Sequence, residues 1–177
     1  GNDKERHIPS WNMLQTKFLE DLKIAGYQTD DIDTVLCTHL HTDHVGWNTI
    51  LVNDKWEPTF KKADYLFGKE EWNYTEKQLG NPLYAEFIND SIIPIIESGL
   101  VRFVELDEKI CKEITLEPTL GHTPGHVSIK INSEGEKAAI TGDFLHHPCQ
   151  MEKLDWISSA DWDLSLIHIS EPTRPSQ

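Results

Sequence analysis

The chain has 177 residues, 38% of them hydrophobic and 26% charged, which is typical of one globular domain with a buried core and excludes a disordered chain. Its formal net charge of −14 argues against nucleic acid as a partner, because binding to a phosphate backbone needs clustered lysine and arginine side chains. No run approaches the roughly 20 apolar residues that cross a bilayer, so no membrane partner is expected.

The three cysteines are far apart and form no CxxC motif. A sparse, odd set predicts free thiols in a reducing compartment, and we therefore expect a cytoplasmic protein. Cys37 lies inside the apolar run TVLC and is predicted to be a core residue.

The first part of the sequence predicts a helix and then a buried strand. Residues 10–26 have apolar side chains at helical spacing, with Ser10 as a possible N-cap and Gly26 as the stop. Residues 33–39, DTVLCTH, predict a short strand that leads into a cluster of histidines.

The middle of the chain predicts a second strand over residues 62–67, followed by a helical region over residues 70–74. Residues 81–100 are apolar at mixed spacing and contain Pro94, which predicts two short helices or one kinked helix. Four short strand-like runs follow: 101–106, 113–118, 126–131 and 137–142, with a hairpin turn at 133–136. Strands interleaved with helices predict an α/β layered domain.

Seven of the nine histidines fall into three patches, and each patch follows a strand-like run. This grouping favours a metal site over scattered structural histidines. The patches are His39, His41 and His44; His122 and His126; and His146 and His147.

The spacing of the first patch suits two cations. Side chains at positions i and i+2 of an extended chain point the same way, so His39 and His41 can reach one cation together. If the chain then turns into a helix, Asp43 and His44 leave on a different side and can hold a second cation. Neutral imidazole suits zinc, and a carboxylate widens the choice to manganese or iron.

Residues 39–44 fit the pattern HxHxDH, residues 121–126 read GHTPGH and residues 141–143 read TGD. Together these motifs resemble, in order and spacing, the metal motifs of the metallo-β-lactamase superfamily. The resemblance extends from Gly1 to about Asp163. It implies an α/β fold of the metallo-β-lactamase type, an αββα sandwich that is incomplete here, without its N-terminal strands and C-terminal helix.

The resemblance also implies a ligand set. The first metal would be bound by His39, His41 and His122, and the second by Asp43 and His44. Asp143 would bridge the two metals. His126 would orient its loop rather than bind metal.

His146 is the position that bears on the substrate. A tyrosine occupies the matching place in the superfamily's quorum-quenching lactonases and polarises the substrate carbonyl, so His146 is expected to contact the substrate. His147 is expected to be structural. The candidate catalytic residues are therefore Asp43, Asp143 and His146.

The implied activity is that of a metal-dependent hydrolase. Two divalent cations about 3.5–4 Å apart, zinc by expectation and manganese or iron as alternatives, share a hydroxide that attacks a carbonyl or phosphoryl centre. The phrases HVGWNT and DFLHHP resemble the lactonase-like branch, so a small lactone, ester or related molecule is the expected substrate.

Residues 164–174, LSLIHISEPTR, match the translation of a transposase adapter used for sequencing libraries. We therefore predict a partial domain over residues 1–163, truncated at both ends, and a non-native tail over residues 164–177. His168 in that tail is not expected to be the further histidine with which the family binds its second metal. Two alternatives stay open: a catalytically inactive metal-binding fragment, or an oxidoreductase or dioxygenase with one iron.

Overall fold

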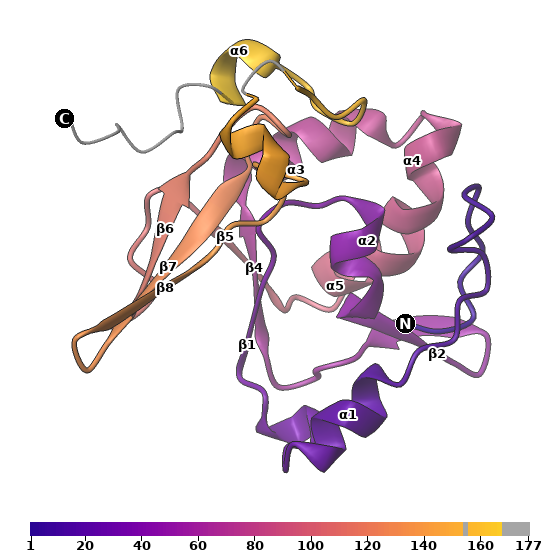
Figure 1. Cartoon of the computed structure of the whole chain (residues 1–177). Helices are drawn as coiled ribbons and strands as arrows, with labels where there is room; N and C mark the ends of the chain where they lie inside the picture. Colours follow the sequence, from indigo (N-terminus) through magenta and orange to yellow (C-terminus); the bar gives the residue numbers. More distant parts are fainter. Residues whose placement is uncertain (154–155, 168–177) are drawn as a thin grey trace, which may run out of the picture. The chain divides into compact units, whose positions relative to one another are not determined.

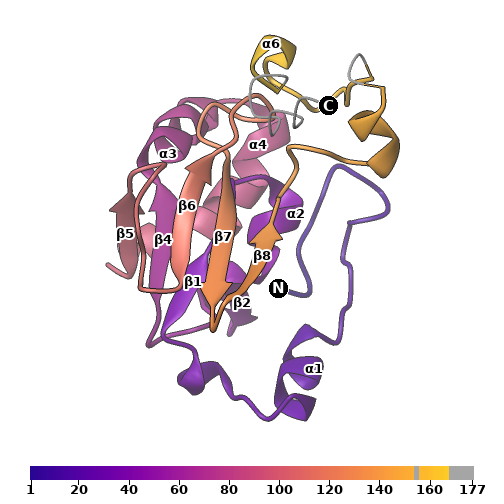
Figure 2. The same cartoon turned by 60° about the vertical axis from the view of Figure 1, so that its left-hand side comes forward.

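A computed structural model of the chain describes residues 1–153 and 156–167 (Figures 1 and 2). The chain divides into two compact units. The first unit consists of Gly1–Phe67 and Thr75–Phe103, and the second of Gly68–Tyr74 and Val104–Gln177.

The sheet of the first unit contains the two predicted strands. β1 (Thr34–Leu36) pairs in parallel with β4 (Asp64–Gly68), and β5 (Val101–Val104) lies on the other side of β4. The central strand β4 is paired along both edges and carries fully buried side chains, Tyr65 among them. The strand predictions are confirmed, and Cys37, directly after β1, is buried as expected.

A short helical segment and a hairpin follow β1. α2 (Thr42–Val45) and a 3-10 turn, η2 (Gly46–Asn48), lead into the antiparallel pair β2 (Thr49–Val52) and β3 (Lys55–Pro58). This hairpin was not predicted from the pattern of apolar residues. Its signal is the dipeptide Asn53–Asp54, whose φ angles of 49° and 60° are tolerated best by Asn, Asp and Gly.

The predicted helix over residues 10–26 is wrong in its first half, because α1 spans only Phe18–Ile24. The preceding residues fold back on themselves instead. The Met13 backbone N–H donates to the Lys4 carbonyl oxygen, and the Asn2 and Thr16 groups bond to each other. These bonds across the loop replace the helical ones, so apolar spacing alone was misleading here.

The apolar segment before β5 is a kinked helix, as predicted. α4 (Pro82–Phe87) passes into a π-helical segment, η4 (Ile88–Ile92), and then into α5 (Ile93–Glu97), with Pro94 at its start. Two 3-10 turns complete the first unit, η1 (Thr29–Asp31) and η3 (Glu76–Gln78).

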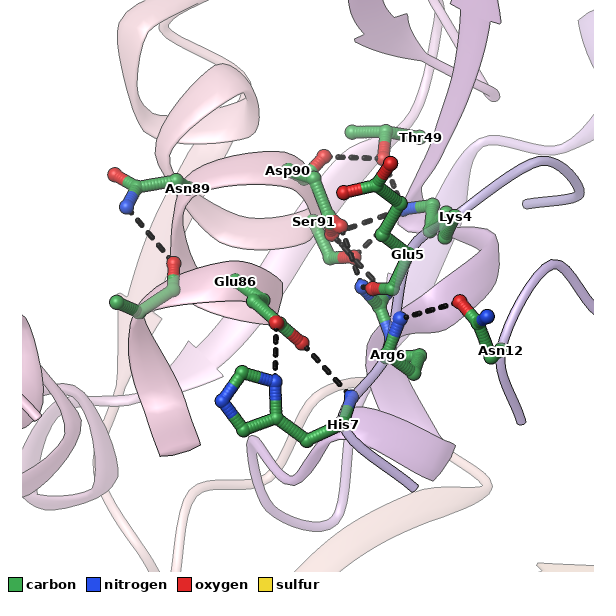
Figure 3. Close-up of polar contacts among 11 residues, drawn as sticks. Lys4, Glu5, Arg6, His7, Asn12, Thr49, Glu86, Asn89, Asp90 and Ser91 are labelled. Atoms are coloured by element: carbon green, nitrogen blue, oxygen red, sulfur yellow. Dashed lines mark hydrogen bonds and ion pairs between the residues drawn. The ribbon is translucent and has the colours of Figure 1, made fainter. Parts of the chain in front are cut away.

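Charged groups tie the N-terminal loop to η4 (Figure 3). The Lys4 ammonium, 3% exposed, lies 3.3 Å from the Asp90 carboxylate and donates to the hydroxyls of Thr49 and Ser91 at 2.6 Å. Arg6 also donates to Asp90, at 2.6 and 3.2 Å. Burial lowers the pKa of Lys4 to about 8, and Asp90 opposes this shift. One carboxylate therefore holds two buried cations.

Tyr65 links β4 to the segment after α2. Its hydroxyl donates to the Asn48 carbonyl oxygen and accepts from the Phe60 N–H, both at 3.0 Å. Burial raises the pKa of Tyr65 from 10.0 to about 12. The folded state therefore keeps the phenol proton between about pH 10 and 12, where the unfolded chain loses it.

Titration of Tyr65 is expected to lower the free energy of unfolding as the pH rises from about 10 to 12, by about 2–3 kcal/mol in all. The stabilisation that comes from keeping the Tyr65 phenol protonated is fully present below pH 10. Denaturant titrations at several pH values should show that the alkaline fall is smaller in Tyr65→Phe than in the wild type. An identical alkaline fall in both proteins would contradict the assignment.

The second unit contains an antiparallel sheet of β6 (Ile114–Pro118), β7 (Val127–Ser133) and β8 (Glu136–Ile140), which lie side by side in Figures 1 and 2. The predicted hairpin turn is confirmed between β7 and β8. Helix α3 (Lys69–Thr75) precedes this sheet in the chain, and η5 (Pro148–Met151) and α6 (Leu164–Ile167) follow it.

The α/β class is confirmed. Within the described ranges, no helix is long and apolar enough to cross a membrane. The first residues of the predicted tail form α6, whereas His168 and the rest of the tail lie outside the described residues. The division at residue 163 stays a prediction.

Candidate metal centre

The six predicted ligands lie in both units: His39, His41, Asp43 and His44 in the first, and His122 and Asp143 in the second. Each group has its own local architecture.

The histidines of the first unit converge where β1 gives way to α2. The ring centroid of His39 lies 4.7 Å from that of His41 and 4.1 Å from that of His44. His41 has extended backbone angles, φ −77° and ψ 160°, and occupies the N-cap of α2. The chain therefore turns from extended to helical between His41 and His44, which is the condition under which Asp43 and His44 were expected to leave on a different side.

Asp43 lies in the first turn of α2. Its Oδ2 is 3.7 Å from the Nε2 of His44. Both side chains are partly exposed, whereas His39 is buried. The first unit thus presents three imidazoles and one carboxylate over a single turn of chain, a donor set that suits zinc, manganese or iron.

The second unit brings together three predicted site residues. Asp143 Oδ2 lies 3.7 Å from His122 Nε2 and 3.5 Å from His146 Nε2. Three ligand atoms, one from each residue, lie within 4.8 Å of one another. His122 comes from the loop between β6 and β7, and the other two residues follow β8.

Asp161 supports His122 and was not predicted from the sequence. The His122 Nδ1–H donates to the Asp161 carboxylate at 2.9 Å, and both side chains are only 1% exposed. The other oxygen of Asp161 accepts the Ser158 N–H at 2.9 Å. The available signal was the S-x-x-D spacing of Ser158 and Asp161. In this spacing an acidic side chain often accepts the backbone N–H of the residue three positions earlier.

His126 is fully buried and holds the backbone of Asp143. Its Nε2 accepts the Asp143 N–H at 2.9 Å, so its Nδ1 carries the proton and donates to the Thr119 hydroxyl at 2.8 Å. This contact is the loop-orienting role expected of His126.

Glu71 is a second residue that sequence reasoning missed. It is buried on α3 and accepts from the Thr123 hydroxyl at 2.6 Å and from the Gly125 N–H at 3.1 Å. A Cβ at Gly125 would lie 2.2 Å from the backbone nitrogen of Glu71. The second glycine of GHTPGH therefore permits close packing of the loop on α3, which has no local signature in the sequence.

His147 has a structural role, as expected. Its Nδ1 accepts the Cys149 N–H at 3.2 Å and caps η5. Gln150, in the same turn, accepts the backbone N–H groups of His146 and His147 at 2.7 and 3.0 Å.

Comparison with known proteins places this geometry in a family. A sequence model of the Metallo-beta-lactamase superfamily matches residues 6–168. An N-acyl homoserine lactonase from a Bacillus species is 28% identical over 120 residues, which cover 68% of this chain and 41% of the lactonase. A second, from Bacillus cereus, is 29% identical over 113 residues, covering 64% of this chain and 38% of the lactonase. The chain thus spans less than half the length of these curated relatives.

Solved structures agree on the fold. The hydrolase AbOPH of the beta-lactamase superfamily has a TM-score of 0.74 at 26% identity, over 93% of this chain and 59% of AbOPH. The dizinc quorum-quenching lactonase AidC, solved with a product, has a TM-score of 0.70 at 24% identity, over 96% of this chain and 60% of AidC. With the family match extending over most of its length, the chain belongs to the metallo-beta-lactamase superfamily.

Proposed function

We propose that the chain carries the metal centre of a dinuclear hydrolase that cleaves a lactone, ester or related small substrate. The observation that carries the proposal is the pair of local clusters, three imidazoles around His39 and a carboxylate between two imidazoles around Asp143, at the family's motif positions.

In this proposal, His39, His41 and His122 would hold the first metal. Asp43 and His44 would hold the second, and Asp143 would be shared by both. The mixed imidazole and carboxylate donors suit zinc, with manganese or iron as alternatives. The relative AidC, which is described as a dizinc enzyme, supports zinc as the first choice.

Bound divalent metals supply Lewis-acid activation of water and of the substrate's carbonyl or phosphoryl oxygen. The chain itself supplies orientation and proton transfer. Asp143 is partly exposed, so its carboxylate can accept a proton from an attacking water and pass it on. His126 accepts the backbone N–H of Asp143 and so holds the main chain from which this carboxylate projects. Asp43 is more exposed and lies on the solvent side of α2, where it can orient a water.

The relatives and the net charge support the proposed substrate class. Curated relatives are N-acyl homoserine lactonases, and AidC was solved with the product N-hexanoyl-L-homoserine. The net charge of −14 disfavours polyanionic substrates. A small, partly apolar lactone or ester is therefore the substrate that we propose.

The test is a metal and activity assay on the chain loaded with zinc or manganese and screened against lactones, esters and phosphotriesters. We expect one tightly bound metal equivalent and a second that binds weakly, because the further histidine of the second metal site is not among the predicted ligands. Hydrolysis should fall at least about 100-fold in His39→Ala and in Asp143→Ala, because each variant removes a proposed metal ligand. Full turnover in either variant would refute the assignment. His7→Ala is the matched control, since this histidine is 50% exposed and pairs with Glu86. A single bound, redox-active iron would favour the oxidoreductase alternative instead.

A further inference from the structure

We propose that His146 is a metal ligand, and that with His122 and Asp143 it forms a three-donor site for one divalent cation built entirely within the second unit. The resemblance to the family gave His146 a different role, as a contact for the substrate carbonyl. The inference rests on the proposed function for the ligand roles of His122 and Asp143, and it adds His146 to the donors of the metal that they hold. It does not depend on hydrolysis, because it concerns the binding of a cation by residues of this chain.

The distances between the donor atoms fit a cation. Metal–ligand distances of about 2.0–2.1 Å in a tetrahedral zinc site place neighbouring ligand atoms about 3.3 Å apart. Asp143 Oδ2 lies 3.5 Å from His146 Nε2 and 3.7 Å from His122 Nε2. The rings of His122 and His146 are 4.9 Å apart between centroids. A contraction of a few tenths of an ångström brings both carboxylate–imidazole pairs to ligand spacing.

The first donor, His122, is fixed in the tautomer that a metal needs. Its Nδ1–H points at Asp161, so the lone pair of Nε2 faces Asp143. Two backbone bonds hold the same loop, from the Trp162 N–H to the His122 carbonyl oxygen at 3.1 Å and from the Asp163 N–H to the Gly121 carbonyl oxygen at 2.8 Å.

The second donor, Asp143, is held through His126 by a chain of hydrogen bonds. His126 Nδ1–H donates to Thr119, whose hydroxyl lies 3.1 Å from that of Ser128. The Ser128 hydroxyl donates in turn to the Thr141 carbonyl oxygen at 3.1 Å. This chain fixes the proton of His126 on Nδ1 and leaves Nε2 to accept the N–H of Asp143.

The third donor, His146, is positioned through its backbone. Gln150, itself buried, accepts the His146 N–H through Oε1 and donates through Nε2 to the Trp156 carbonyl oxygen at 3.0 Å. The His146 side chain is 30% exposed, whereas that of His122 is 1% exposed. The proposed site therefore has a buried side and an open side. Three protein donors with one open position are typical of catalytic rather than purely structural zinc sites.

The test measures metal binding in a variant of the 177-residue chain, His39→Ala/His41→Ala/His44→Ala, in which the three clustered imidazoles of the first unit are removed. Calorimetric titration with zinc should find one tightly bound cation. Cobalt in its place should give the visible absorption of a site with two imidazole nitrogens. Adding His146→Ala should weaken binding by at least about 10-fold and change the cobalt spectrum, because one nitrogen donor is lost.

His147→Ala is the matched control, since the neighbouring imidazole caps η5, and it should leave affinity and spectrum unchanged. Circular dichroism checks folding, and His146→Gln takes the place of His146→Ala if the alanine variant is unfolded. Unchanged affinity in the folded His146 variant would overturn the inference. The inference would also be overturned if the His146 variant changed only KM for an ester or lactone, because that is the effect expected from losing a substrate contact. Because the experiment measures metal binding, it tests the role of His146 even if the chain hydrolyses none of the substrates.

Asp161→Asn tests the support of His122. We expect about 10–100-fold weaker zinc binding in the same background, because loss of an outer partner of a ligating histidine has that effect. Asp163→Asn is the control, since this carboxylate accepts from Ser165 instead. Equal affinities in the two variants would remove Asp161 from the site.

Discussion

Asp90→Ala is expected to lower the free energy of unfolding by about 3–5 kcal/mol, measured by urea titration at pH 7 with a chelator present. The variant leaves the ammonium of Lys4 and the guanidinium of Arg6 buried without their carboxylate. At that pH Lys4 is charged in the wild type, because its pKa is about 8. Asp90 raises that pKa, so without Asp90 the buried amine must either stay charged without a counter-ion or lose its proton. The Arg6 guanidinium keeps its charge in the variant, and a buried cation without a counter-ion is costly.

Two controls make this prediction sharp. Lys4→Met should cost less than Asp90→Ala, because the pair between Arg6 and Asp90 stays intact. Glu86→Gln should cost at most about 1 kcal/mol, since Glu86 pairs with the half-exposed His7 on the same N-terminal loop. If Asp90→Ala and Glu86→Gln lowered the free energy of unfolding equally, burial of the ion pairs of Lys4 and Arg6 with Asp90 would not matter for stability.

The local parts of the candidate metal centre could be predicted in part from the sequence. The i, i+2 spacing predicted that His39 and His41 point the same way, and their ring centroids lie 4.7 Å apart. The turn into a helix after His41 was only a condition of the expected second site, and it is present. The strands that precede each histidine patch were also predicted, because short apolar runs bounded by turn residues indicate buried strands. Within the second unit, the resemblance to the family implied that His122 and Asp143 share a metal, and Nε2 of His122 lies 3.7 Å from Oδ2 of Asp143.

The residues that support these ligands could not be predicted, because their partners are distant in the sequence. Asp161 contacts His122 across 39 positions, and Glu71 contacts Gly125 across 54. The S-x-x-D spacing predicts only the local bond of Asp161 to Ser158, and Glu71 has no local signature, so only the fold shows which distant residue each carboxylate contacts. The helix predicted in the N-terminal loop was wrong for a similar reason. Its apolar spacing indicates a helix, but the bond from Met13 to Lys4 and the buried charges of Lys4 and Arg6 fix a loop instead.

Gly125→Ala is expected to cost about 3 kcal/mol or more in the free energy of unfolding, or to displace the loop that carries His122. The new Cβ would lie 2.2 Å from the backbone nitrogen and 2.5 Å from the Cα of Glu71. Because the obstacle is backbone rather than the end of a side chain, no rotamer change relieves it. Shortening the neighbour, as in Gly125→Ala/Glu71→Ala, is therefore not expected to restore stability.

The strain can be released in two ways, and each has its own readout. If the loop keeps its place, urea titration with a chelator records the full loss. If the loop moves away from α3, the loss of stability is smaller, but His122 leaves its position beside Asp143 and zinc binding weakens by about 10-fold or more. Gly80→Ala is the matched control, because a Cβ there meets nothing within 4 Å, and it should change stability by no more than about 0.5 kcal/mol. If Gly125→Ala matched Gly80→Ala in both readouts, the close approach of the loop to α3 would not be what requires glycine at that position.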